Sequence, residues 1–263
     1  MSNIILSHSI YPHKTNQSWV VFIHGAGGSS AIWFRQLRVY QKEHNVLLLD
    51  LRGHGKSNQM LSLADKNYCF DHISQDILNV LDHNDITQAH FVGISLGTII
   101  ISNIALMAPN RVKSMTLGGA ITRFDLRSII LIFSGNTFKH CVPYMWLYRL
   151  FAYIMMPRKH HQESRNLFVR EAKRLNQKEF IRWFKLAQDV NQLMDVFRKK
   201  ELKTPTLYIM GHEDHMFLKP AKQIVNLHKN SILHIIKNCG HVCNVEQPDL
   251  FNRHSLAFID KHL

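Results

Sequence analysis

His90-Phe-Val-Gly-Ile-Ser-Leu-Gly97 is the stretch of sequence that decides the fold. It contains the pattern G-x-S-x-G with Ser95 at its centre, preceded by an apolar run and followed by the apolar segment Leu96 to Met107. We expect a buried strand, a sharp turn and a helix, with the serine hydroxyl raised above the strand end at the helix N-terminus. Five-residue patterns also occur by chance, so the flanking strand and helix carry the interpretation of Ser95 as a nucleophile rather than as a packing turn.

The same alternation of apolar runs and helix-like segments extends along most of the chain. Buried apolar strands alternating with helices are typical of a mostly parallel sheet covered on both faces, so we predict an α/β fold. The short N-terminal stretch leaves room for one or two weak leading strands at most. The predicted strands are Trp19–His24, Asn45–Asp50, His90–Ile94, Val112–Leu117, Thr206–Met210 and Ile232–Ile236, and the predicted helices are Ile32–Gln41, one N-capped by Asp71, Leu96–Met107 and Pro248–His262.

The alternation stops between Ile121 and Lys203, where the sequence is helical, aromatic and basic. We predict that residues 121–203 form a helical cap inserted into a core domain made of residues 1–120 and 204–263. An apolar stripe at helical spacing runs through the cap, and we interpret most of it as ordinary packing. The stripe consists of Phe180, Trp183, Phe184, Ala187, Val190, Met194 and Phe197.

The charge of the chain is unevenly distributed. The 263 residues carry a formal net charge of +13, and residues 121–203 contribute +10 of it, with 17 Lys and Arg against 7 Asp and Glu. A hydrophobic content of 46% excludes disorder as the main state. No nucleic-acid motif is recognisable, so we expect no nucleic-acid partner. A solvated outer face is the favoured interpretation of the basic residues; the rival hypothesis is a basic lid that attracts anionic or lipid-like substrates, or an anionic membrane surface.

Cysteine usage and the N-terminus indicate the compartment. Four cysteines in a chain of this length do not form a disulfide scaffold. Met1 to His8 lacks the basic and long apolar regions of a signal peptide, and the apolar stretch Val142 to Met156 is too short to span a bilayer. We therefore expect a soluble cytoplasmic protein.

Two residues in the last third of the chain could activate Ser95. A serine hydroxyl needs a histidine to accept its proton and an acid to orient that histidine. His241 follows the predicted strand ending near Lys237, and Asp214 follows the strand ending at Met210, so both belong at the sheet edge that carries Ser95. Glu213 is a rival for the acid, and a loop-capping role is the alternative for Asp214.

Backbone donors for an oxyanion are expected at two places. One is the N–H of Leu96, directly after the candidate nucleophile. The other belongs to the glycine-rich loop after the first apolar strand, with Ala26 as the candidate and Gly27 as the fallback. The same loop could be a turn with no donor role, and its glycine spacing does not fit phosphate binding.

Taken together, these motifs resemble the α/β-hydrolase superfamily, from about Trp19 to the end of the chain except for the cap. The resemblance rests on His24-Gly-Ala-Gly-Gly, Asp50-Leu-Arg-Gly-His-Gly-Lys-Ser57, Gly-Ile-Ser95-Leu-Gly, Gly211-His-Glu-Asp214 and Gly240-His241, in that order. It implies a serine nucleophile, Asp214 rather than Glu213 as the acid, a cap inserted after the Val112 strand, and a structural role for the Asp50 loop. Ser95 argues against relatives with an aspartate nucleophile, and Ile99 against the menaquinone-pathway lyases, which carry arginine there.

The expected activity is hydrolysis of a carboxylic ester or related acyl bond of a small or lipid-like substrate, through an acyl-enzyme on Ser95. An acyltransferase, thioesterase, lactonase or carbon–carbon bond hydrolase could use the same groups, and a non-catalytic ligand-binding member is a third hypothesis. We expect no cofactor and no metal, because the Cys239-x-His241-x-Cys243 spacing is unusual for zinc. Phe133 and Pro143 to Met156 could line an acyl pocket or merely pack the cap. Specific substrate and oligomeric state stay open.

Overall fold

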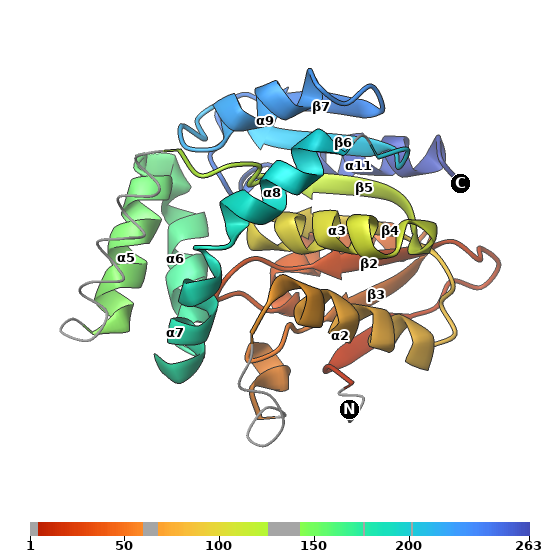
Figure 1. Cartoon of the computed structure of the whole chain (residues 1–263), viewed down its shortest axis with the longest axis horizontal. Helices are drawn as coiled ribbons and strands as arrows, with labels where there is room; N and C mark the ends of the chain where they lie inside the picture. The colour runs from red at the N-terminus through yellow and green to blue at the C-terminus, as the bar shows by residue number, and fades with distance from the viewer. Residues whose placement is uncertain (1–4, 60–67, 126–142, 176, 201) are drawn as a thin grey trace.

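The computed structural model describes residues 5–59, 68–125, 143–175, 177–200 and 202–263. Their strands form one sheet of seven in the order β1-β3-β2-β4-β5-β6-β7 (Figure 1). All neighbouring strands are parallel except β1 and β3, which are antiparallel. The strands are β1 His8–Tyr11, β2 Trp19–Ile23, β3 Asn45–Leu49, β4 Ala89–Ile94, β5 Val112–Gly118, β6 Thr206–Gly211 and β7 Ser231–Ile236.

Helices cover both faces of the sheet, which explains why the central strands are apolar throughout. Every residue of β3, β4 and β6 is buried, whereas the edge strand β7 is largely half-exposed. On one face α2 (Phe70–His83) packs against α3 (Leu96–Met107), and on the other α1 (Phe34–Tyr40) contacts α11 (Pro248–Asp260). Two shorter helices, α9 (Leu218–Val225) and α10 (Cys243–Glu246), follow β6 and β7.

We call four further helices the roof; three of them, α5 to α7, lie beyond one end of the sheet at the left of Figure 1. The roof consists of α5 (Tyr144–Met155), α6 (Gln162–Ala172), α7 (Gln177–Leu186) and α8 (Val190–Lys199), together with the 3₁₀ turn Lys159–His161 that precedes α6. The last of these helices returns across α3, and its buried side chains Val190, Met194 and Phe197 belong to the same apolar core as the sheet. The division into a core domain and a cap of residues 121–203 stays a proposal.

One detail predicted for α2 is wrong. The helix begins at Phe70, so its N-cap is Cys69, whose sulfur accepts a hydrogen bond from the N–H of His72. Asp71 lies in the first turn, where its carboxylate suits the helix dipole. It accepts a hydrogen bond of 2.9 Å from Asn103 on α3. Asp71 therefore joins two helices instead of capping one.

Two other features refine the predicted helices. The segment predicted as Ile32 to Gln41 starts with a 3₁₀ turn at Ser30–Trp33 before α1 begins. The apolar stripe of the roof is divided between α7 and α8, which are separated by residues 187–189. Within the described part of the chain, no helix combines the length and the hydropathy needed to cross a bilayer.

Candidate active site

Ser95 lies in a strained turn between β4 and α3. Its backbone has φ 54° and ψ −122°, a conformation that an L-residue rarely adopts. The flanking glycine is required, because a Cβ at Gly97 would clash with the carbonyl oxygens of Ile23 and His24. The absence of that Cβ lets α3 approach the end of β2 closely. Helix and strand together raise the hydroxyl of Ser95 above the sheet edge.

His241 and Asp214 meet Ser95 at this edge. Nε2 of His241 lies 2.9 Å from Oγ of Ser95, and Nδ1 of His241 lies 2.8 Å from Oδ2 of Asp214. The two loops that carry these residues directly follow β7 and β6, so three strand ends deliver three side chains to one place. The other carboxylate oxygen of Asp214 accepts a hydrogen bond from the N–H of Phe217, which fixes its orientation.

Glu213, the rival acid, points in a different direction. Its Oε2 lies 2.7 Å from Nε2 of His160 and 2.9 Å from Nε2 of His161. Burial raises the pKa of Glu213, but the hydrogen bond from His160 and the charge of Arg158 outweigh it and bring the pKa below its usual range. The geometry therefore brings Asp214 to His241, and turns Glu213 toward the roof.

Two backbone N–H groups border the space in front of Ser95. Leu96 is the first residue of α3, so its N–H has no partner within the helix. Ala26 lines the same space. The N–H of Gly27, the fallback donor, is already engaged by Nε2 of His54 at 2.9 Å. Ala26 is thus the better placed of the two candidates in this loop.

His54 supports the glycine-rich loop from below, a role that the sequence did not reveal. Its Nδ1 lies 3.1 Å from the carbonyl of Arg52, so Nδ1 carries the proton and Nε2 is free to accept from Gly27. Burial, reinforced by the neighbouring His24, lowers the pKa of His54 to about 3. Burial lowers the pKa of His24 as well. Both imidazoles are therefore neutral at physiological pH.

A cavity of about 350 Å³ opens in front of Ser95, between the sheet edge and the roof. We call it the chamber. None of the described residues that line it carries a charged side chain. Among these described residues, Ser95 and Tyr148 carry the side-chain hydroxyls. The chamber is lined by Ala26, Ser95, Leu96, Ile99, Ile121, Phe124, Leu147, Tyr148, Leu150, Phe151, Met155, Phe168, Phe180, Trp183, Phe184, Ala187 and Val190.

The roof contributes more to this lining than the packing interpretation of its apolar residues suggested. Five members of the stripe, from Phe180 to Val190, face the chamber. So do five residues of α5, between Leu147 and Met155. Phe133, which was also considered for an acyl pocket, lies outside the described residues. Spacing alone could not separate these residues from core residues, because both kinds are apolar.

Acidic residues of the roof are buried against the core. Glu171 accepts a hydrogen bond of 2.8 Å from the hydroxyl of Ser29. Glu179 accepts one from Tyr68, and the indole N–H of Trp183 donates to the carbonyl of Arg52 at 3.2 Å. An unpaired charge is costly inside a protein. The hydrogen bonds to these buried carboxylates therefore favour the observed position of the roof on the core.

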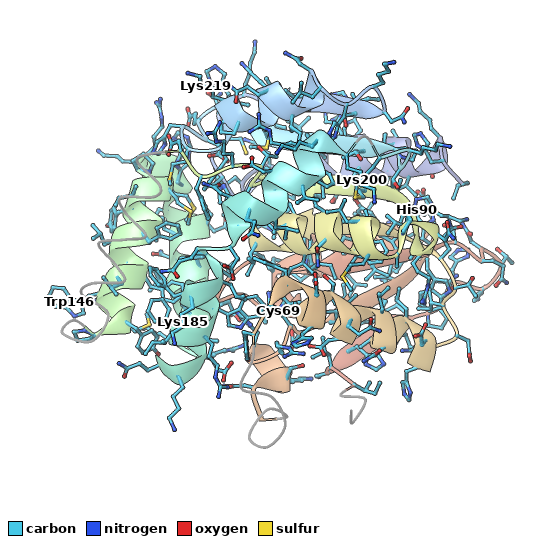
Figure 2. The ribbon with its side chains drawn as sticks, in the orientation of Figure 1. Cys69, His90, Trp146, Lys185, Lys200 and Lys219 are labelled. Atoms are coloured by element: carbon cyan, nitrogen blue, oxygen red, sulfur yellow. The ribbon has the colours of Figure 1, made fainter. Side chains whose placement is uncertain are left out.

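The outer side of the roof is basic and partly apolar. Figure 2 shows Lys185 on α7 and Trp146 on α5, and both side chains are exposed. Among the described residues, no basic side chain of the roof lines the chamber. The favoured interpretation of the charge, a solvated outer face, is consistent with this arrangement.

Cys239 and Cys243 are free and buried beside the loop of His241. Burial raises the pKa of both thiols. Thiols with raised pKa values hold their protons and are poor nucleophiles and poor metal ligands. The hydroxyl of Ser95 is therefore the better candidate for chemistry in this region.

The chain is similar to proteins of known sequence and structure. A model of the alpha/beta hydrolase fold matches residues 18–137. The dihydrolipoyllysine-residue acetyltransferase component of an acetoin cleaving system from Pseudomonas putida is 30% identical over 251 residues, or 92% of this chain and 64% of that protein. A putative carbamate hydrolase, RutD, from Pseudomonas syringae is 26% identical over 257 residues, or 91% and 93% of the two chains.

A solved structure of a hydrolase from Pseudomonas aeruginosa has a TM-score of 0.82 at 21% identity, covering 97% of this chain and 94% of the other. The chain therefore spans slightly less than two thirds of the acetyltransferase component but nearly all of the two hydrolases. These likenesses, with the observed strand order, confirm the predicted fold class: a mostly parallel sheet with helices on both faces.

Proposed function

We propose that the chain, which resembles the alpha/beta hydrolase fold over residues 18–137, is a serine hydrolase of the α/β-hydrolase superfamily that cleaves carboxylic esters of apolar acids. The observation that carries the proposal is the chain of contacts from Ser95 Oγ to His241 Nε2 at 2.9 Å and from His241 Nδ1 to Asp214 Oδ2 at 2.8 Å. A hydroxyl, an imidazole and a carboxylate in this order form the minimal apparatus for acyl transfer to serine.

The first half of the reaction acylates Ser95. Its Oγ attacks the ester carbonyl while Nε2 of His241 takes the hydroxyl proton. The N–H groups of Leu96 and Ala26 donate to the oxygen that becomes negatively charged. His241 then gives the proton to the departing alcohol, and Asp214 stabilises the imidazolium that forms in between.

The second half releases the acid. Water enters the place that the alcohol leaves, and His241 accepts one of its protons as the oxygen attacks the acyl carbon. The collapse of this second tetrahedral intermediate breaks the bond to Ser95 Oγ, which takes the proton back from His241. The same donors serve both halves, so the loop supported by His54 contributes to each.

The chamber indicates the class of acyl group. Its walls are apolar, so they favour a hydrocarbon acyl chain and disfavour a substrate that must bury a charge there. A volume of about 350 Å³ is at the lower end of the range for small-molecule sites, which suits short and medium chains. An anion such as carbamate would lose its hydration in this chamber without gaining a charged partner.

A fluorophosphonate probe and a panel of activated esters test the proposal. The wild-type chain should be labelled and should hydrolyse acyl chains from acetyl upward, with kcat/KM rising as the chain fills the chamber. Ser95→Ala should lose labelling and about 10⁶-fold in kcat. Ser102→Ala is the matched control, because Ser102 is also on α3 but bonds the carbonyl of Thr98 and lies outside the chamber lining.

Unchanged labelling of Ser95→Ala would overturn the proposed nucleophile. Binding of esters without turnover would favour the non-catalytic hypothesis. Faster consumption of the ester in the presence of an added alcohol, with a new ester as product, would favour the acyltransferase.

A further inference from the structure

Two adjacent histidines of the roof converge on one carboxylate oxygen of the core. His160 and His161 end the 3₁₀ turn at Lys159–His161 that precedes α6. Their Nε2 atoms lie 2.7 and 2.9 Å from the same atom, Oε2 of Glu213. The histidine pair and Glu213 are more than 50 residues apart in sequence, so tertiary structure brings these three side chains together.

A second carboxylate lies next to this group, on the side of His161. Oε2 of Glu246, on α10, lies 3.6 Å from Nε2 of His161. Glu246 is held in place by the N–H of Gly240 at 2.6 Å and by the hydroxyl of Ser164 at 3.0 Å. The side chains of His161, Glu213 and Glu246 are 0, 9 and 5% exposed, so three of the four are largely withdrawn from water.

We propose that His160, His161 and Glu213, whose ligand atoms all lie within 4.8 Å of one another, bind a divalent transition-metal ion such as Zn²⁺, with Glu246 shifting to serve as the fourth ligand. A tetrahedral ion with bonds of about 2.0–2.1 Å places its ligand atoms roughly 3.3 Å apart. The observed separations of 2.7, 2.9 and 3.6 Å lie on both sides of that value, so small shifts of the side chains admit the ion. Two imidazoles favour Zn²⁺ over Mg²⁺ and Ca²⁺, which prefer oxygen ligands.

Two features bear on the selectivity of the site. Arg158 lies 3.3 Å from Oε2 of Glu213 and competes with a cation, but its side chain is 61% exposed and can turn into solvent. A second group of potential ligands, Glu43, His44 and Asp260, has one imidazole, and its two carboxylates are on exposed residues. The first group offers more nitrogen ligands and less exposure, and the second provides an internal control.

An ion in this site would join the roof to both loops of the proposed catalytic triad. His160 and His161 belong to the roof side, whereas Glu213 directly precedes Asp214 in sequence. Glu246 bonds Gly240, which directly precedes His241, and the ring of His161 packs against the same glycine. A ligand that binds the folded state alone stabilises it, so bound metal should hold the roof on the core and raise the unfolding temperature.

Metal titration of the whole, untagged chain tests the site. After treatment with a chelator, the protein is titrated with Zn²⁺ by calorimetry and with Co²⁺ by visible absorption, and its thermal unfolding is followed with and without Zn²⁺. The wild-type chain should bind one ion and unfold at a higher temperature when loaded. His160→Ala and Glu213→Gln should each weaken binding at least tenfold.

The choice of variants keeps the result interpretable. The side chain of His160 is 48% exposed, so its truncation leaves the fold intact. Asp260→Asn, with a side chain 49% exposed, removes a ligand from the second group and should leave the Zn²⁺ affinity unchanged. Equal affinity in wild type and His160→Ala, loss of binding in Asp260→Asn, or no binding at micromolar Zn²⁺ would each overturn the proposal. None of these outcomes depends on whether Ser95 is a nucleophile.

Discussion

The floor and the roof of the chamber differ in what they present to it. The floor, around Ser95 and Leu96, lies in the turn after β4, where the N–H of Ser95 donates to the carbonyl of Gly118 at 3.0 Å. The roof presents apolar side chains and one hydroxyl, that of Tyr148. Its polar residues, such as Glu171 and Glu179, are used at the contact with the core instead. In our proposal, chemistry therefore belongs to the floor and selection of the acyl group to the roof.

Replacement of Asp214, the proposed acid, tests the floor and should have the largest effect. In Asp214→Asn the amide no longer holds His241 in the tautomer that accepts a proton, so kcat should fall about 10⁴-fold. The neighbouring Glu213→Gln is the matched control and should lose less than tenfold, because Glu213 contacts roof histidines instead of His241. Steady-state kinetics on one activated ester measures both. Equal losses would mean that the two carboxylates share the role.

Acid should weaken the floor through His54. The pKa of this imidazole is about 3 in the folded state, against 6.5 as its ordinary value. Below pH 6.5 the unfolded chain binds a proton at His54 that the folded chain does not bind. This histidine alone therefore lowers the free energy of unfolding by about 1.4 kcal/mol for each unit that the pH drops, down to pH about 3, and other buried histidines such as His90 add to the slope. Urea unfolding at pH 7 and pH 5 measures this slope.

His54→Gln should reduce the slope. A glutamine can accept from Gly27 and donate to the carbonyl of Arg52, as the imidazole does, but it does not titrate. An unchanged slope in this variant would assign the acid sensitivity to other buried histidines, such as His24.

A larger side chain in the roof should have the smallest effect and change selectivity alone. Ala187→Phe places a ring in the chamber, so kcat/KM for octanoyl esters should fall about tenfold while acetyl esters lose little. The matched control is Lys185→Phe, on the exposed side of α7. Ala221→Phe on α9 would not serve, because that site is fully buried. An equal fall for both esters would mean that the roof also positions the floor.

The floor could be predicted because its signals are local. Ser95, Asp214 and His241 each follow a strand, and in a parallel sheet the strand ends that carry them lie along one edge. Glycines such as Gly97 mark the turns that need close backbone approach. The contact between His54 and Gly27 was not predictable in the same way, since it joins two loops from different strands.

The sequence could not predict which roof residues face the chamber, for a physical reason. Apolar residues at helical spacing can face a chamber or a core, and only tertiary packing decides between them. The cluster around Glu213 joins three segments that are distant in sequence, so no local motif predicts it. The expectation of no metal considered only Cys239, His241 and Cys243. Asp71 has the chemistry of an N-cap, yet contact with Asn103 and a helix start one residue earlier changed its role.

The strand order also has a consequence during synthesis on the ribosome. β5 and β6 are neighbours in the sheet, but the whole roof is encoded between them. While the ribosome translates that segment, β5 lacks its partner and offers an open edge to other chains. Ser95 has by then been made, whereas Asp214 and His241 have not. Under the proposed mechanism, a nascent chain therefore carries a serine without its histidine and acid, and hydrolysis can begin only after the last two strands have emerged and paired.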